Sequence, residues 1–229
     1  MPFLALAAYP SAVFLAFSTN PIELRWGSTQ ARRGHTWTEP LPKELRDRAD
    51  AVARHLNFLV DALILILVVT LSRAMRVAPA GFGLQFADWK SGALVGIAAG
   101  IALIGIMSLI LRKIPIDPEH AFTCRVRRGS LPLWLAIFLA GAFSEELWVA
   151  FCIVAFTRTG HSATASISVT VLVFAATHYS YRFWGAVSVG AKETVSALLF
   201  LHFGSLVPMC LYHFVGNLGS LYWNRYWHR

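Results

Sequence analysis

Two adjacent glutamates, Glu145 and Glu146, lie inside an apolar run that spans residues 131–156. Successive residues on a helix are separated by about 100°, so only one of the two can face a given cavity while the other faces a neighbouring helix. A buried carboxylate can act as a general base toward water. The alternative is a structural pair whose oxygens are satisfied by hydrogen bonds from neighbouring helices.

Two later apolar runs carry further polar groups. His178 ends the stretch Phe-Ala-Ala-Thr-His, and His213 precedes Asn217 by one helical turn. His213 and Asn217 can therefore share a face, and both can donate hydrogen bonds to a developing negative charge, as in an oxyanion site. Taken singly, His178 and the His213–Asn217 pair are also compatible with polar contacts between helices.

The surrounding chain has the composition of an integral membrane protein. Of its 229 residues 56% are hydrophobic and 14% are charged, which is too apolar for an ordinary soluble domain. We expect an all-α, polytopic transmembrane helix bundle with about seven spans, because a span requires roughly 17–25 apolar residues. The expected spans are residues 2–18, 57–71, 91–111, 131–156, 163–181, 185–203 and 206–222. Ionisable groups within such spans are costly and indicate a functional site that faces the bundle interior.

Basic residues fall between the apolar runs, which argues against nucleic-acid binding and gives an orientation. With the N-terminus outside, the inner segments hold 16 of the 20 Lys and Arg residues and the outer segments hold 4. This bias predicts a cytoplasmic C-terminus. We expect the plasma (inner) membrane as the location, with the lipid bilayer and a membrane-anchored protein or peptide substrate as partners and no nucleic acid.

Several smaller features have structural interpretations. Residues 43–55 are compatible with an amphipathic helix at the membrane surface or with a solvated loop. Gly92, Gly96 and Gly100 recur at four-residue spacing and predict a close helix-packing face. Lys192-Glu193 interrupts the sixth span, and we expect a charged break between half-helices there. Of the three cysteines, Cys152 and Cys210 lie in apolar runs and are expected to be buried thiols.

The order Glu-Glu, Phe-x-x-x-His and His-x-x-x-Asn, each on its own span, resembles the CPBP family of intramembrane proteases. That family includes the prenyl-protein CaaX proteases and bacteriocin-processing or immunity proteins. The resemblance covers roughly residues 131–217, and residues 203–213 also resemble the family's approach to its last motif. It implies that Glu145 activates water with help from His178, that His213 and Asn217 stabilise the oxyanion, and that Glu146 is a supporting acid.

One position departs from the family pattern. The family's first motif is Glu-Glu-x-x-x-Arg, and here the sixth position is Ala150. The motif arginine would lie one turn after Glu146 and could pair with it, which alanine cannot do. The candidate substitutes are Lys192 and Arg182.

The cofactor prediction is that none is required. Glutamate and two histidines could bind zinc, and a zinc-bound water would be a ready nucleophile. However, the sequence has no His-Glu-x-x-His helix, and the resemblance favours a glutamate mechanism without an obligatory metal.

We predict N-terminal transmembrane helices with basic loops over residues 1–130, the catalytic bundle over 131–223 and a short basic tail over 224–229.

These observations predict an intramembrane endopeptidase that uses glutamate-activated water on membrane-anchored or C-terminal-tail substrates. The first alternative is a catalytically inactive relative that acts as a membrane scaffold or immunity protein, and Ala150 motivates it. The second is a proton or ion transporter that uses the same buried groups as a relay. Transporters often contain internal repeats, and we find none relating the first three spans to the last four.

Overall fold

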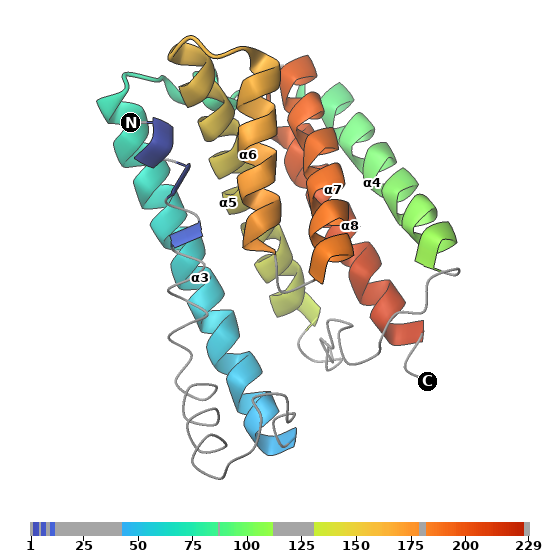
Figure 1. Ribbon diagram of the computed structural model, residues 1–229. Helices are drawn as coiled ribbons and strands as arrows, with labels where there is room; N and C mark the ends of the chain where they lie inside the picture. The colour runs from blue at the N-terminus through green and yellow to red at the C-terminus, as the bar shows by residue number, and fades with distance from the viewer. Residues whose placement is uncertain are drawn as a thin grey trace.

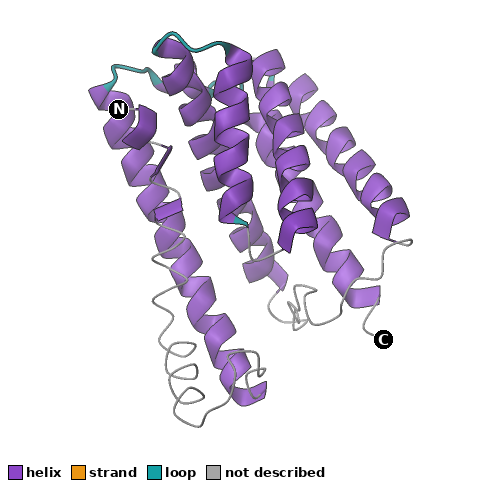
Figure 2. Cartoon of the chain, in the orientation of Figure 1, coloured by secondary structure: helices purple, strands orange, loops and turns teal. Residues whose placement is uncertain are grey.

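A computed structural model describes the backbone over residues 2–4, 6–7, 10–11, 43–86, 88–111, 131–178 and 182–226. Most of the expected first span and Cys124 lie outside these residues. Within them the chain is helical and contains no strand, which confirms the all-α prediction (Figure 2). The elements from residue 43 onward are α3 (Lys43–Ala74), η1 (Pro79–Phe82), α4 (Trp89–Leu111), α5 (Leu131–Arg158), α6 (Ala163–Thr177), α7 (Arg182–Phe203) and α8 (Leu206–Tyr226).

The helix α5, which carries the two glutamates, is the central helix of the bundle. It contacts α3, α6, α7 and α8, whereas α4 packs mainly on α8. Figure 1 shows α3 at one side of the bundle and α4 at the other. A residue on α5 can therefore meet side chains from most of the remaining helices.

Among the described residues, three helices contain segments that are long and apolar enough to cross a membrane: 89–106 in α4, 135–158 in α5 and 186–203 in α7. The helix α6 is apolar but shorter. Large apolar side chains such as Leu94, Ile101 and Leu172 point outward and are 60–70% exposed. Apolar groups on the outside and ionisable groups within are the arrangement expected of a helical membrane protein. The structure thus supports a membrane bundle and confirms part of the expected set of spans.

Two helices run further than the sequence pattern suggested. Residues 43–55 belong to α3, which continues without a break to Ala74, so the loop interpretation of this segment is wrong. The predicted break at Lys192-Glu193 is also wrong, because α7 is continuous from Arg182 to Phe203. Glu193 is 1% exposed and faces the interior, which explains how a charged pair is accommodated within an unbroken helix.

The predicted glycine face packs α4 against α8. A Cβ atom at Gly96 would lie 2.4 Å from the Pro208 carbonyl oxygen, and one at Gly100 would lie 2.7 Å from Val215 Cβ. Gly92 likewise faces Pro208. Only glycine permits this approach of the two backbones, so the interpretation as a packing face is confirmed.

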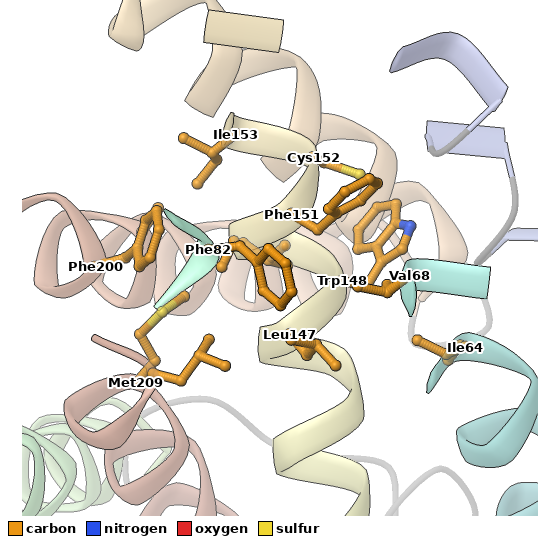
Figure 3. Packing of buried hydrophobic residues seen from close by; sticks show 14 of the residues in the cluster. Ile64, Val68, Phe82, Leu147, Trp148, Phe151, Cys152, Ile153, Phe200 and Met209 are labelled. Atoms are coloured by element: carbon orange, nitrogen blue, oxygen red, sulfur yellow. The ribbon is translucent and has the colours of Figure 1, made fainter. Parts of the chain in front are cut away.

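An apolar core packs around the part of α5 that follows the two glutamates. Trp148 and Phe151 are fully buried, and Phe151 meets Phe82 of η1 edge to face with ring centroids 6.1 Å apart. Figure 3 shows side chains of α3 on one side of α5 and side chains of α7 and α8 on the other. Cys152 and Cys210 are buried, as predicted. Since interiors packed in this way resist displacement, the core fixes the rotation of α5 and thus the directions of its glutamates.

Candidate active site

Glu146 lies at the centre of the polar cluster and is completely buried. Its Oε2 accepts a hydrogen bond from Ser196 Oγ at 2.6 Å, and its Oε1 lies 2.7 Å from Nδ1 of His213. These contacts join α5 to α7 and α8. A buried carboxyl group requires such partners, and the two together fix its orientation.

Glu145 points in a different direction, as the helical geometry predicted. Its side chain is 23% exposed, and its Oε2 lies 3.5 Å from Nε2 of His213. Of the two adjacent glutamates, Glu145 is therefore the one that water can reach, while Glu146 is enclosed.

His213 connects the two glutamates. Its ring is nearly buried, with Nδ1 facing Glu146 and Nε2 facing Glu145. A carboxyl group at each nitrogen holds the plane of the ring. The Nε2 atom thereby lies on the side of the cluster where Glu145 is partly exposed.

Asn217 lies one turn after His213 on α8. Its Oδ1 accepts a hydrogen bond from Lys192 Nζ at 3.3 Å. With Oδ1 occupied in this way, the amide NH₂ is the group of Asn217 that can donate to a bound molecule. Lys192 also lies within electrostatic reach of Glu145, Glu193 and Glu146.

His178 forms the C-terminal cap of α6. Its Nδ1 lies 2.9 Å from the Phe174 carbonyl oxygen and 3.1 Å from Thr177 Oγ1, and its ring stacks on Phe174 with centroids 4.8 Å apart. Donation from Nδ1 to the carbonyl leaves the lone pair of the neutral ring on Nε2. The geometry thus brings Glu145, Glu146, His213 and Asn217 into one cluster, and it fixes His178 against its own helix.

The comparison with protein families agrees with this arrangement. Residues 127–219 match the profile of the family described as Type II CAAX prenyl endopeptidase Rce1-like. We refer to residues 127–219 as the Rce1-like segment because of this similarity. The match confirms the resemblance stated from the three motifs, and it implies a protease that acts within the membrane. No curated protein and no solved structure matches the chain significantly.

The Rce1-like segment accommodates the alanine that replaces the motif arginine. Ala150 is completely buried and belongs to the apolar core. The partners that Glu146 has instead are His213 and Ser196. Lys192, one of the two cations predicted as a substitute, lies in the cluster next to Asn217. The side chain of Arg182 lies outside the described residues.

The Rce1-like cluster includes a third glutamate that the sequence did not single out. Glu193 contacts Glu146, and its Oε1 is buried without a hydrogen-bond partner among the described residues. The ligand atoms of Glu146, Glu193 and His213 all lie within 4.8 Å of one another. A signal was present in the sequence, because Glu193 follows Lys192 inside an apolar run, but the pair looked like an interfacial break.

Asp61 is the other group that sequence reasoning did not connect with the Rce1-like site. Its Oδ1 accepts a hydrogen bond of 2.5 Å from Ser144 Oγ. Asp61 also lies within electrostatic reach of Glu145. This contact ties α3 to the start of the Glu-Glu motif and adds negative charge beside Glu145.

Proposed function

We propose that this protein is an intramembrane endopeptidase in which Glu145 activates the attacking water. The single observation that carries the proposal is the different exposure of the two glutamates. Glu145 is partly open and Glu146 is closed, and both contact the same histidine. Only Glu145 can meet a water molecule and then receive its proton.

The proposed reaction begins with transfer of a proton from water to Glu145 as the oxygen attacks the carbonyl carbon of the scissile peptide. The resulting oxyanion accepts hydrogen bonds from the Asn217 amide and from Nε2–H of a protonated His213 ring, whose Nδ1–H donates to Glu146, in a setting poor in water. Collapse of the intermediate breaks the C–N bond, and Glu145 returns the proton to the leaving amine. The products are a carboxylic acid and an amine, which at neutral pH become a carboxylate and an ammonium ion, so atoms and charges balance.

The supporting groups have separate roles in this proposal. Glu146 and Ser196 orient His213 through its Nδ1, and Lys192 orients Asn217 through its Oδ1. The role of His178 as an assistant of Glu145 is carried over from the family resemblance. The attacking water needs no metal ion. Substrates are membrane-anchored proteins or peptides, and the family description suggests prenylated C-terminal tails.

Purified protein in liposomes, incubated with membrane-anchored peptides with and without a chelator, tests the proposal. We expect cleavage by the wild type and a loss of at least about 100-fold in Glu145→Gln, which removes the base but keeps the shape of the side chain. Asp88→Asn removes a carboxylate outside the cluster and serves as the matched control. Products are identified by mass spectrometry.

Three outcomes would contradict the proposal. Equal cleavage by Glu145→Gln and wild type would exclude Glu145 as the base. A wild type that cuts nothing, while an active relative cuts the same peptides, would favour the inactive scaffold. Cleavage that a chelator abolishes would replace glutamate-activated water with metal-activated water.

A further inference from the structure

Asp61 of α3 lies beside the glutamates of α5, although it is far from them in the sequence. Its Oδ1 accepts a hydrogen bond of 2.5 Å from Ser144 Oγ, and Ser144 directly precedes Glu145. Ser144 is completely buried, and Asp61 is partly buried. Hydroxyl groups that donate to an ionised carboxylate typically do so at about 2.5–2.7 Å. The contact therefore holds a negative charge against the turn of α5 that carries Glu145.

Glu145 lies between two groups that act on its carboxylate in opposite directions. Asp61, on α3, is within electrostatic reach of Glu145 and has a charge of the same sign. His213, on α8, has its Nε2 atom 3.5 Å from Glu145 Oε2. Figure 3 shows side chains of α3 and of α8 on opposite sides of α5. Because like charges repel strongly where water is scarce, Asp61 disfavours positions of the Glu145 carboxylate that point toward α3.

We propose that Asp61 is a positioning residue that directs the Glu145 carboxylate toward Nε2 of His213. The role rests on the proposed function, in which Glu145 is the base. Ser144 holds the Asp61 carboxylate in place, and the charge of Asp61 acts on Glu145. A carboxylate held beside His213 receives the proton of the attacking water close to where the oxyanion forms, which is the geometry that the reaction needs.

This role extends the working parts of the protein beyond the segment that matches the family. Asp61 lies outside residues 127–219, so the family match does not assign it a function. The alternative role of Asp61 is purely structural, in which the hydrogen bond to Ser144 joins α3 to α5 and the charge has no effect on Glu145. Two substitutions separate these roles. Asp61→Asn removes the charge and keeps an oxygen that can accept from Ser144, whereas Ser144→Ala keeps the charge and removes the hydrogen bond.

Cleavage kinetics of the folded variants give the first measurement. We expect kcat to fall at least about tenfold in Asp61→Asn, because a misdirected base loses its alignment with the water, and KM to stay within about twofold. Ser144→Ala should keep kcat within about threefold of the wild type, because the charge remains. Asp61→Glu, the conservative variant, should retain most of the activity. Asp88→Asn removes a carboxylate outside the cluster and should match the wild type.

The second measurement needs no substrate. In protein labelled with ¹⁵N-histidine, the Nε2 resonance of His213 depends on whether a carboxylate faces that nitrogen. Its signal is identified as the one that Glu145→Gln shifts most, since Glu145 faces Nε2. We expect Asp61→Asn to shift this signal in the same direction, because the Glu145 carboxylate moves away from the ring. Asp88→Asn should leave the signal unchanged.

An Asp61→Asn variant with the kcat of the wild type would overturn the role of Asp61, and so would a larger loss of kcat in Ser144→Ala than in Asp61→Asn. If Asp61→Asn does not fold, Asp61→Ser also removes the charge and takes its place in both measurements. A protein that cuts no peptide but shows the expected shift of the His213 signal contradicts only the proposed function. An active protein in which Asp61→Asn changes neither kcat nor the signal contradicts only the role of Asp61.

Discussion

Glu146 Oε1 lies 2.7 Å from Nδ1 of His213, and this contact joins the central helix α5 to α8 at the most deeply buried point of the polar cluster. It holds the ring so that the opposite nitrogen faces Glu145. The role of Glu146 is therefore to orient the His213 ring. Removing either partner leaves the other without its main contact.

His213→Ala should destabilise the protein substantially. It leaves the Glu146 carboxyl buried with Ser196 as its remaining described hydrogen-bond partner, and breaking a buried pair typically costs about 3–5 kcal/mol. Thermal unfolding in detergent measures the effect. His202→Ala is the control, because His202 is exposed and contacts Phe203 at the end of α7. Equal melting temperatures for the two variants would show that the buried contact contributes little.

Lys192→Met should lower the turnover number of the folded protein, because Lys192 orients Asn217 through a hydrogen bond of 3.3 Å. A misoriented donor of this kind can reduce the rate about 100-fold. Lys192→Arg retains a cationic donor and should recover part of the activity. Steady-state cleavage kinetics separate the constants. A change confined to KM in Lys192→Met would show that Lys192 binds substrate and does not position Asn217.

Much of the helix layout follows from the sequence, because long apolar runs between basic or proline-containing segments leave few alternatives. The expected span 91–111 corresponds to α4, and 206–222 corresponds to most of α8. The face formed by Gly92, Gly96 and Gly100 was also predictable from the sequence. Small residues at four-residue spacing have one main use in an apolar helix, which is close packing.

The composition of the cluster was only partly predictable. Glu145, Glu146 and His213 stand out because they are ionisable groups within apolar runs. Glu193 was misinterpreted, and Asp61 was not connected with the site, because their orientation depends on how α7 and α3 are rotated against α5. That rotation is set by packing among residues far apart in the chain, such as Asp61 and Ser144, and no local pattern encodes it.

Ala150→Arg, which restores the arginine of the family motif, should not improve catalysis. Ala150 is completely buried in the apolar core, so the larger side chain has no room and its charge would be desolvated. We expect a lower yield of folded protein by size-exclusion chromatography and no gain in cleavage per folded molecule. Ala136→Arg, at an exposed position of the same helix, is the control for adding an arginine to α5. Increased activity in Ala150→Arg would show that Lys192 does not substitute for the motif arginine.

Gly96→Ala should separate α4 from α8, because the new Cβ would lie 2.4 Å from a backbone oxygen of Pro208, which cannot move independently of its helix. Overpacking of this kind costs about 1–3 kcal/mol. Gly105→Ala is the matched control on the same helix, since no atom of the described residues outside its own helix turn lies within 4 Å of its new Cβ. It should be neutral or stabilise the helix by up to about 1 kcal/mol. Thermal unfolding of both variants in the same detergent measures the difference, and equal melting temperatures would contradict the close approach of the two helices.

Because α8 carries His213 and Asn217, Gly96→Ala should also lower cleavage activity, whereas Gly105→Ala should preserve it.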